Sequence, residues 1–241
     1  PTIIIHIMLR RLARPVRTLC SSAPAAPVVL SADALEPTVR LLTLSNPRQL
    51  NAMTVAMGEA VQDAVHSLAE LPPSEMRAVV VTGEGRAFSA GGDLEFLEAR
   101  RGDDPTSNAL AMVRAPPRAR HAPRERTTHQ SPRCASSCQR RFYERFLCIR
   151  TLPVPVLACI NGPAIGAGLC FAMGADLRVT HDEAKLGFTF VGLGLHPGMG
   201  CTHTIAHACG GQAASRLLLT GDVIGGAEAA RLGLVAASLP D

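Results

Sequence analysis

The chain has few aromatic residues and no apolar stretch long enough to span a membrane. Its 241 residues include no tryptophan, one tyrosine and 3% aromatic residues in all, so we expect a core built from alanine, valine, leucine and isoleucine. No apolar run approaches the roughly 20 residues that a transmembrane helix needs, and we expect no membrane partner. A hydrophobic content of 47% with 18% charged residues is typical of a globular chain that can bury a sizeable core.

Lysine is almost absent, and the positive charge is concentrated in two arginine-rich stretches. Lys185 is the only lysine, while the formal net charge is +4. Four arginines lie between residues 10 and 17, and seven lie within residues 114–140, where Glu125 is the only acid. The rest of the chain is net negative, which is not the pattern of a nucleic-acid-binding surface. We therefore expect no nucleic-acid partner, and an RNA-binding arm at 114–140 is the alternative.

The sequence patterns of metal and nucleotide sites are also missing. Cys134 and Cys138 are separated by three residues, but no second pair or histidine couplet completes a zinc site, so we expect no metal. No phosphate-binding loop with Gly-Lys-Ser/Thr and no G-x-G-x-x-G dinucleotide fingerprint is present. Ala87 stands where the nucleophile elbow of a serine hydrolase needs its first glycine.

Two segments are expected to lie outside the folded domain. Residues 8–27 are rich in arginine, serine and alanine and lack acids, which resembles a mitochondrial transit peptide, with a disordered tail as the alternative. We therefore assign 1–30 to an N-terminal extension, expect ordered structure from about Thr38, and predict the mitochondrial matrix as the location. Residues 114–140 combine four prolines, seven arginines and no periodicity, so we predict neither helix nor strand there and interpret them as an insertion in a domain spanning 31–241.

Apolar runs and helical patterns alternate through the remainder. Strands are predicted at 39–44, 77–83, 155–162, 177–180 and 184–187. Helices are predicted at about 55–68, after residue 162, and at about 200–209, 212–219 and 226–232. Such alternation favours an α/β domain. Five cysteines in apolar surroundings are expected to be reduced and mostly buried, namely Cys148, Cys159, Cys170, Cys201 and Cys209.

Two glycine-rich corners follow two of the apolar strands. They are GEGRAFSAGGDL at 83–94 and NGPAIGAG at 161–168. Small residues let backbone N–H groups approach a ligand closely, and the second corner opens a helix, whose free N–H groups and dipole favour negative charge. Two such N–H groups converging on one point would form an oxyanion hole that needs no ionisable side chain. Tight packing alone is the alternative for each corner taken singly.

Taken in order, eight segments resemble the crotonase, or enoyl-CoA hydratase/isomerase, superfamily. They are NPRQLNAM, VVVTGEGRAFSAGGDL, PVLACINGPAIGAG, ADLRV, AKLGF, GLHPGMG, LLLTG and AARLGLV. The resemblance covers about residues 39–241 apart from the insertion. It implies an α/β fold, a crotonase-like spiral of ββα repeats, with the family's C-terminal helical part truncated here. It also implies a homotrimer or hexamer and an acyl-CoA thioester as substrate, with coenzyme A entering only as part of that substrate and no separate cofactor.

The resemblance also assigns site residues. Matching the family's motifs places the two oxyanion-hole N–H groups at Gly92 and Ala167. Its CoA-binding positions map to Arg48, Leu50, Ala52, Ala87, Ser89 and Asp93. Arg48 could pair with a phosphate of CoA, because a guanidinium suits that role.

Hydratases of this family add water across a double bond with two glutamates. The resemblance maps these glutamates to Cys170 and Phe190, neither of which is an acid, and no Asp or Glu occurs between Ala184 and His203. A two-glutamate hydratase is therefore not expected. His196 could move a proton instead, because imidazole titrates near neutral pH, with a structural turn residue as the alternative.

Other candidates have simpler interpretations. Cys170 could act as a nucleophile only if its pKa were lowered, and packing is the simpler interpretation. Glu84 and Glu95 are expected to be solvated, and Asp176 to fix a turn or the start of a strand. His203 and Cys201 are weaker candidates on the following helix.

The sequence therefore predicts an enzyme of the enoyl-CoA hydratase/isomerase family, a lyase or isomerase of fatty-acid or acyl-CoA metabolism that stabilises a thioester enolate. The alternatives are a catalytically inactive CoA-binding homologue and a fragment from an incorrect gene model.

Overall fold

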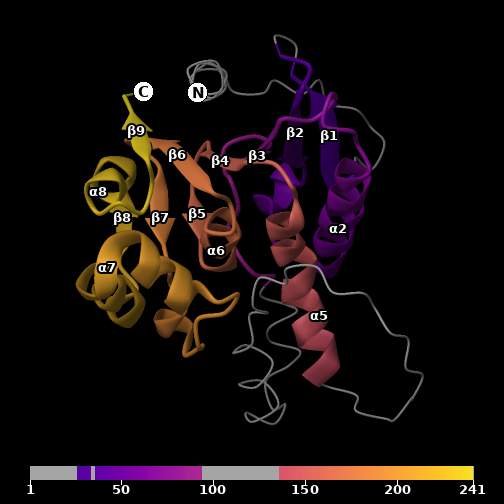
Figure 1. The fold of residues 1–241 in the computed structure, drawn as a ribbon. Helices are drawn as coiled ribbons and strands as arrows, with labels where there is room; N and C mark the ends of the chain where they lie inside the picture. The colour runs from indigo at the N-terminus through magenta and orange to yellow at the C-terminus, as the bar shows by residue number, and fades with distance from the viewer. Residues whose placement is uncertain (1–25, 34–35, 94–135, 241) are drawn as a thin grey trace.

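The computed structural model describes residues 26–33, 36–93 and 136–240 (Figure 1). Strands and helices alternate along the chain, so the expected α/β class is confirmed. The insertion apart from its last residues, and the basic stretch near the N-terminus, lie outside the described residues. No helix among the described residues is long and apolar enough to cross a membrane.

A six-stranded sheet forms the centre of the domain. Its strands are β1 (Val28–Ala32), β2 (Val39–Leu44), β3 (Ala78–Gly83), β4 (Val156–Ile160), β6 (Leu177–His181) and β9 (Ala237–Leu239). They lie in the order β1-β2-β3-β4-β6-β9, with β1 antiparallel to β2 and every other pair parallel. Every residue of β3 and β4 is buried, as expected for parallel strands that are covered on both faces.

A second, smaller sheet lies beside the chain's glycine-rich turns. It consists of β5 (Ala164–Ile165), β7 (Lys185–Gly187) and β8 (Val223–Gly225), in the order β5-β7-β8. β5 is parallel to β7, and β7 is antiparallel to β8. β5 lies inside the second glycine-rich corner, so the pairing of β5 with β7 holds that corner in place.

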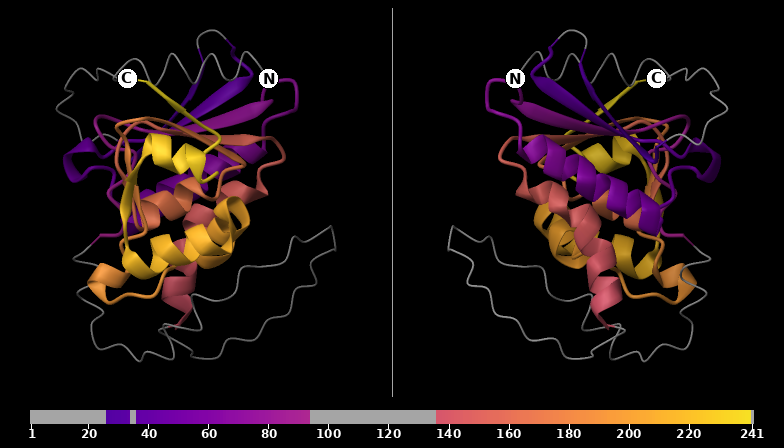
Figure 2. Two further views of the ribbon diagram at one scale, coloured as in Figure 1. Left: turned by 90° about the vertical axis from the view of Figure 1, so that its left-hand side faces the viewer. Right: turned by 90° about the vertical axis from the view of Figure 1, so that its right-hand side faces the viewer.

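The helices gather on one face of the six-stranded sheet (Figure 2). The α-helices are α2 (Val55–Ala69), α5 (Ser136–Leu147), α6 (Ala167–Ala172), α7 (Cys201–Thr220) and α8 (Gly226–Arg231). Short 3₁₀ helices are η1 (Pro47–Gln49), η2 (Cys148–Thr151) and η3 (Val191–Leu193). The main hydrophobic core lies between this face and the helices. α5 packs against α2, where a Cβ on Gly58 would lie 3.1 Å from the Phe146 ring.

Phenylalanine contributes more to the core than the composition suggested. Phe88, Phe146, Phe171 and Phe188 are fully buried beside the aliphatic residues. The ring of Phe171 in α6 lies 6.4 Å from that of Phe88 and 5.9 Å from that of Phe146 in α5. Although the chain has few aromatic residues, these rings connect α5 and α6 to the first glycine-rich corner.

Two sequence-based boundaries were wrong. β1 begins at Val28, before the expected start of order at Thr38; it is an edge strand with four exposed residues that pairs only with β2. α5 begins at Ser136, so the last five residues of 114–140, for which neither helix nor strand was predicted, are helical. The two helices expected at about 200–209 and 212–219 are confirmed, because α7 comprises both and its helical geometry breaks between them at Gly210.

Candidate functional site

The two glycine-rich corners lie at the same edge of the sheet. β3 and β4 are parallel neighbours that end at Gly83 and Ile160, so the segments following them leave the sheet side by side. We call residues 83–93 the first corner and residues 161–168 the second corner. The carboxyl edge of parallel strands is where α/β proteins commonly bind ligands.

Backbone hydrogen bonds join the two corners directly. The N–H groups of Phe88 and Ser89 both donate to the carbonyl of Pro163, at 3.1 Å each. The N–H of Ile165 donates to the carbonyl of Ser89 at 3.0 Å. Segments more than 70 positions apart in the sequence therefore form one continuous backbone surface.

Some of the glycines serve packing between the corners. A Cβ on Gly162 would lie 2.2 Å from the carbonyl oxygen of Arg86, and one on Gly168 would lie 2.6 Å from that of Ser89. Real Cβ atoms cannot approach an oxygen so closely, so both positions require glycine. The packing interpretation is thus correct for these two residues, and it does not exclude a ligand role for their neighbours.

Gly91 brings the first corner against the start of α6. Its φ is +100°, a value that favours glycine, and a Cβ there would lie 2.5 Å from the Ile165 carbonyl oxygen and 3.6 Å from the Ala167 nitrogen. Gly92 follows directly and is partly exposed. Neither the Gly92 N–H nor the Ala167 N–H donates a hydrogen bond to any residue that the structure describes. The two expected oxyanion-hole positions therefore lie in adjoining segments with free donors.

α6, the helix predicted after residue 162, is short. It spans six residues and begins after Gly166, whose φ is +52°. Because glycine has no side chain, Gly166 makes no N-cap hydrogen bond to the helix. A helix of this length has a small dipole, so the second corner's capacity to bind an anion depends on its free N–H groups. The Gly166 N–H itself is engaged with the Gly187 carbonyl at 2.8 Å.

The side chain of Asn51 holds the first corner from one side. Its Nδ2 donates to the carbonyls of Glu84 at 3.0 Å and Ala87 at 2.8 Å. Its Oδ1 accepts from the Asn46 N–H at 2.8 Å. The residue is fully buried, so each of these hydrogen bonds satisfies a group that water cannot reach.

Asn161 holds the same corner from the other side. Its Oδ1 accepts from the Gly83 N–H at 3.0 Å and from the Thr82 hydroxyl at 3.3 Å, while its Nδ2 donates to the Gly85 carbonyl at 3.0 Å. Because Asn161 itself begins the second corner, its amide fixes one corner to the other.

The residues expected to bind CoA come from two segments that the structure places side by side. The Ala90 N–H donates to the Leu50 carbonyl at 2.9 Å, and the Met53 N–H donates to the Gly91 carbonyl at 2.8 Å. The positions Arg48, Leu50 and Ala52 thereby lie along the segment that holds Ala87, Ser89 and Asp93. Arg48 is exposed, and no carboxylate of a described residue forms an ion pair with it.

Ser89 has an internal role in this arrangement. It is fully buried, and its hydroxyl donates to the Asn51 carbonyl at 2.8 Å and accepts from the Gly91 N–H at 3.2 Å. The Gly91 N–H is thereby engaged, and Gly92 provides the next donor along the chain. The sequence identified Ser89 but contained no sign of these partners.

Cys170 and Phe190, the positions mapped to the family's glutamates, are both buried. Cys170 lies in α6 close to Cys201, and burial, with a contribution from Cys201, raises its pKa well above the ordinary value of a thiol. A thiol of this kind is a packing residue and not an activated nucleophile. The Phe190 ring and the Thr189 hydroxyl each lie 4.0 Å from where a Cβ on Gly166 would be, so both border the second corner.

The histidine candidates lie on the surface. His196 is exposed in the loop between η3 and α7. His203 is exposed in the first turn of α7, where its ring stacks on that of His207 at 6.2 Å. The structure gives neither histidine a contact with the two corners.

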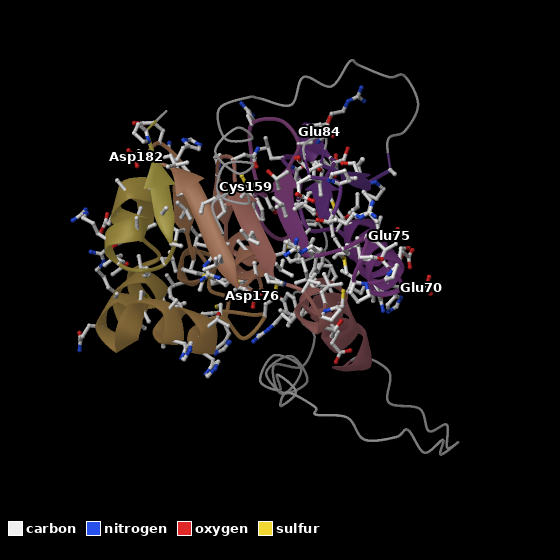
Figure 3. All side chains as sticks on the ribbon, turned by 45° about the horizontal axis from the view of Figure 1, so that its top comes forward. Glu70, Glu75, Glu84, Cys159, Asp176 and Asp182 are labelled. Carbon is white, nitrogen blue, oxygen red and sulfur yellow. The ribbon has the colours of Figure 1, made fainter. Side chains whose placement is uncertain are left out.

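The carboxylates have structural roles. Asp176 accepts a hydrogen bond from the Val156 N–H at 2.8 Å and so fixes the start of β4, as expected. Glu84, expected to be solvated, is partly buried and accepts a hydrogen bond from the Ser45 hydroxyl. Figure 3 shows Glu84, Asp176 and Asp182 in separate parts of the molecule, so they form no common acidic site. Glu95 lies outside the described residues. No group of three or more possible metal ligands occurs among the residues that are described.

Sequence reasoning missed Tyr143 in α5. Its hydroxyl lies against Gly198, and its ring is close to the thiols of Cys170 and Cys201. The one signal that could have drawn attention to it is that it is the only tyrosine of the chain.

Comparison with known proteins identifies the family of the chain. A family model described as enoyl-CoA hydratase/isomerase matches residues 39–241. The probable enoyl-CoA hydratase EchA14 of Mycobacterium tuberculosis is 36% identical over 208 residues, which cover 86% of this chain and 68% of that protein. A Thermus thermophilus protein named as an enoyl-CoA hydratase is 34% identical over 197 residues, covering 82% and 66%. The chain thus spans about two thirds of the length of these relatives.

Solved structures confirm the expected fold. An enoyl-CoA hydratase of a Polaromonas species matches with a TM-score of 0.68 and 29% identity, covering 88% of this chain and 70% of that one. A Thermobifida fusca protein crystallised in complex with acetoacetyl-CoA matches with a TM-score of 0.67 and 32% identity, covering 90% and 74%. The family model covers most of the chain, two relatives are more than 30% identical to it, and the chain belongs to the enoyl-CoA hydratase/isomerase family.

Proposed function

We propose that the chain binds an acyl-CoA thioester and stabilises its enolate with the backbone N–H groups of Gly92 and Ala167. The observation that carries this proposal is the contact of Gly91 with the start of α6, which sets two N–H groups without described partners in adjoining segments. Membership of the family supports it. So does the acetoacetyl-CoA bound by the related Thermobifida fusca protein.

Two backbone donors suit this chemistry because negative charge develops on the thioester carbonyl oxygen during the reaction. As the α-carbon of a thioester becomes an enolate, negative charge accumulates on the carbonyl oxygen. Hydrogen bonds to that oxygen strengthen in the transition state, and fixed backbone groups need no reorganisation to provide them. Loss of one such donor typically lowers a rate by about 100-fold to 1,000-fold.

Arg48 is the residue that we propose for a phosphate of CoA. It is exposed, it lies in the segment beside the first corner, and no described carboxylate neutralises it. A planar guanidinium can hold two phosphate oxygens at once. Coenzyme A would enter as part of the substrate, and the proposal includes no other cofactor.

The reaction we propose is of the enolate type within the lyase and isomerase chemistry of the family, without a glutamate pair. Cys170 and Phe190 cannot replace two carboxylates, so hydration by two glutamates is not part of the proposal. The second candidate is a CoA-binding homologue without activity. The observation that favours it is the burial of Cys170, which keeps its thiol protonated.

Calorimetry with acetyl-CoA, together with exchange of its α-protons in heavy water, tests the proposal. We expect binding in the micromolar range and catalysed exchange. Binding without exchange would favour the inactive homologue, and absence of binding would overturn the proposal.

A proline at position 167 tests the donor itself. Ala167 is the first residue of α6, a position where helices tolerate proline. Ala167→Pro removes one N–H and should lower exchange by about 100-fold. Ala167→Gly retains the N–H and serves as the control.

A homotrimer or hexamer and a location in the mitochondrial matrix stay predictions that rest on the resemblance and on the arginine-rich N-terminal stretch. The relatives described above are bacterial. Sedimentation of the purified chain would test the assembly, and imaging of a tagged chain in its own cells would test the location.

A further inference from the structure

We propose that the phenol of Tyr143 donates the proton to the α-carbon of the enolate, in the role that a carboxylic acid would otherwise fill. The inference rests on the proposed function, because it assumes a bound acyl-CoA thioester. It adds a named proton donor to a site in which Cys170 and Phe190 occupy the glutamate positions.

The hydroxyl end of Tyr143 lies against the loop that precedes α7. A Cβ on Gly198 would be 2.8 Å from the Tyr143 Oη and 2.9 Å from its Cζ. Gly198 is buried, so the glycine provides the space that the phenol occupies. This loop, 194–200, is one of the segments that carry the family resemblance.

The same ring faces the beginning of α6. The Tyr143 hydroxyl interacts electrostatically with the thiols of Cys170 and Cys201. Cys170 lies three positions after Ala167 in α6, about one helical turn from the free N–H of that residue. The phenol is therefore near the turn that supplies one of the two proposed oxyanion donors.

Aromatic contacts fix the position of this part of α5. The Phe142 ring lies 5.4 Å from the rings of both Tyr143 and Phe146, and Phe146 contacts Phe171 of α6 at 5.9 Å. Because Phe146 and Phe171 are fully buried, α5 cannot shift against α6 without disturbing the core. Tyr143 is thus held by packing and is not placed by a hydrogen bond.

The chemistry of the phenol suits a donor. Its hydroxyl makes no hydrogen bond to any residue in the described part of the chain. Burial, with smaller contributions from Cys170 and Cys201, raises the pKa of Tyr143 to about 12. The phenol is consequently neutral and carries its proton near pH 7. A neutral phenol carries a proton that it can give to a thioester carbanion, which is a stronger base than tyrosinate.

The step conserves atoms and electrons. The enolate electron pair forms the new C–H bond at the α-carbon, the phenolic O–H bond breaks, and the thioester carbonyl forms again. The resulting tyrosinate takes a proton from water. In the reverse direction tyrosinate removes an α-proton. Because tyrosinate is a minor species near pH 7, exchange should rise with pH as more of it forms, and α-proton exchange reports on the step in this way.

Tyr143→Phe removes only the hydroxyl and should preserve the aromatic packing. We expect exchange of the acetyl-CoA α-protons in heavy water to fall about 100-fold. The dissociation constant of acetyl-CoA should change by less than about threefold, because the hydroxyl acts after binding. Ser67→Ala is the matched control: that hydroxyl is exposed on α2 and bonds to the Asp63 carbonyl, and its loss should leave exchange unchanged.

A spectroscopic measurement gives a second test, and a purely structural role of Tyr143 would not produce the result that we expect from it. Since Tyr143 is the only tyrosine, isotopic labelling of the phenolic carbon yields a single magnetic-resonance signal from the full chain. Acetyl-CoA should shift this signal and free CoA should not, because the phenol faces the acyl group.

The outcomes separate the two proposals. Exchange in Tyr143→Phe equal to wild type, or a phenol signal that acetyl-CoA leaves unchanged, overturns the role of Tyr143. A wild-type chain that binds acetyl-CoA without exchange also overturns it, while thioester binding stands. A chain that binds no acetyl-CoA overturns the proposed function itself.

Discussion

Gly91 is the residue whose replacement should most directly disturb the two corners. Its φ of +100° is strained for any residue with a side chain, and an alanine Cβ would lie 2.5 Å from the Ile165 carbonyl oxygen. Gly91→Ala should therefore lower the free energy of unfolding by about 2 kcal/mol or more. Denaturant unfolding of the purified variant measures this loss.

Gly192 provides the matched control for that substitution. No atom lies within 4 Å of a Cβ built there, and its φ is not in the left-handed region. Gly192→Ala should change the free energy of unfolding by less than about 0.5 kcal/mol. If both variants lose the same stability, the close contact of Gly91 with α6 is not what holds the corners together.

Cys148 makes stability depend on pH in the alkaline range. Burial raises the pKa of Cys148 to about 11. The folded state thus disfavours the Cys148 thiolate. The stability that the protonated thiol contributes is complete below the unfolded thiol's pKa of about 8.5, and it is lost as the pH rises toward 11. The free energy of unfolding should fall over this window, as measured by urea unfolding under reducing conditions.

Cys148→Ser tests the assignment of that effect. A serine hydroxyl can still donate to the Arg145 carbonyl, which the thiol reaches at 2.9 Å, but it does not titrate. The variant should lose less stability than wild type between about pH 8.5 and pH 11. Tyr143 contributes a loss of the same sign at higher pH, because burial raises its pKa as well. An identical decline in both chains would rule out Cys148 as a source.

Single residues differ in how far the sequence reveals their roles. The glycines of the two corners were recognisable, because glycine directly after an apolar strand indicates a tight turn or a close backbone approach. The role of Ser89 was not, since its partners Asn51 and Gly91 depend on how two distant loops meet. Tyr143 could not be assigned either, because its neighbours come from α6 and from the loop before α7.

At the scale of elements, the loop that contains Asn51 holds the first corner in place. Asn51 has a φ of +55°, and its buried amide makes hydrogen bonds to Glu84, Ala87 and Asn46. Asn51→Gly tolerates the backbone conformation and removes only the amide, so it should cost about 1–3 kcal/mol. Asn51→Ala adds backbone strain and should cost more. Thermal or denaturant unfolding of both variants measures the two contributions.

Asn46→Ala is the control for the loop. The Asn46 side chain bonds to Gln49 within its own exposed turn, at 2.7 Å, so its removal should cost little. Should Asn51→Gly prove as stable as wild type, the amide would not be what fixes the first corner.

Strands were predictable from the sequence where every one of their residues is buried. β3 and β4 are buried throughout and were identified as apolar runs ended by glycine or Asn-Gly. β8 and β9 are short, and most of their residues are partly or fully exposed, so they lacked a pattern.

At the scale of the whole molecule, the order of motifs carried more information than any single motif. Each corner alone was compatible with simple packing, and the structure shows that packing at Gly162 and Gly168. The fold was identified by the order of the motifs from Asn46 onward, because their order and spacing match those of the crotonase family. The pairing of β1 with β2, and the placement of α5 against α6, depend on three-dimensional contacts that no local pattern encodes.

The connection between the first corner and α5 allows a test of the predicted insertion. Residues 114–135 are arginine-rich and proline-rich, and we predict that they add nothing to the fold. Their deletion about halves the connection between Asp93 and Ser136, which changes loop-closure entropy by only about 0.6 kcal/mol, in the stabilising direction. The remaining residues 94–113 can still extend roughly 60 Å. The shortened chain should therefore melt within a few degrees of wild type and bind acetyl-CoA with unchanged affinity, as measured by circular dichroism and calorimetry.

A second chain, in which residues 114–135 are replaced by glycine and serine at equal length, separates the effect of the segment's length from that of its sequence. Loss of cooperative melting in both chains would show that these residues belong to the domain.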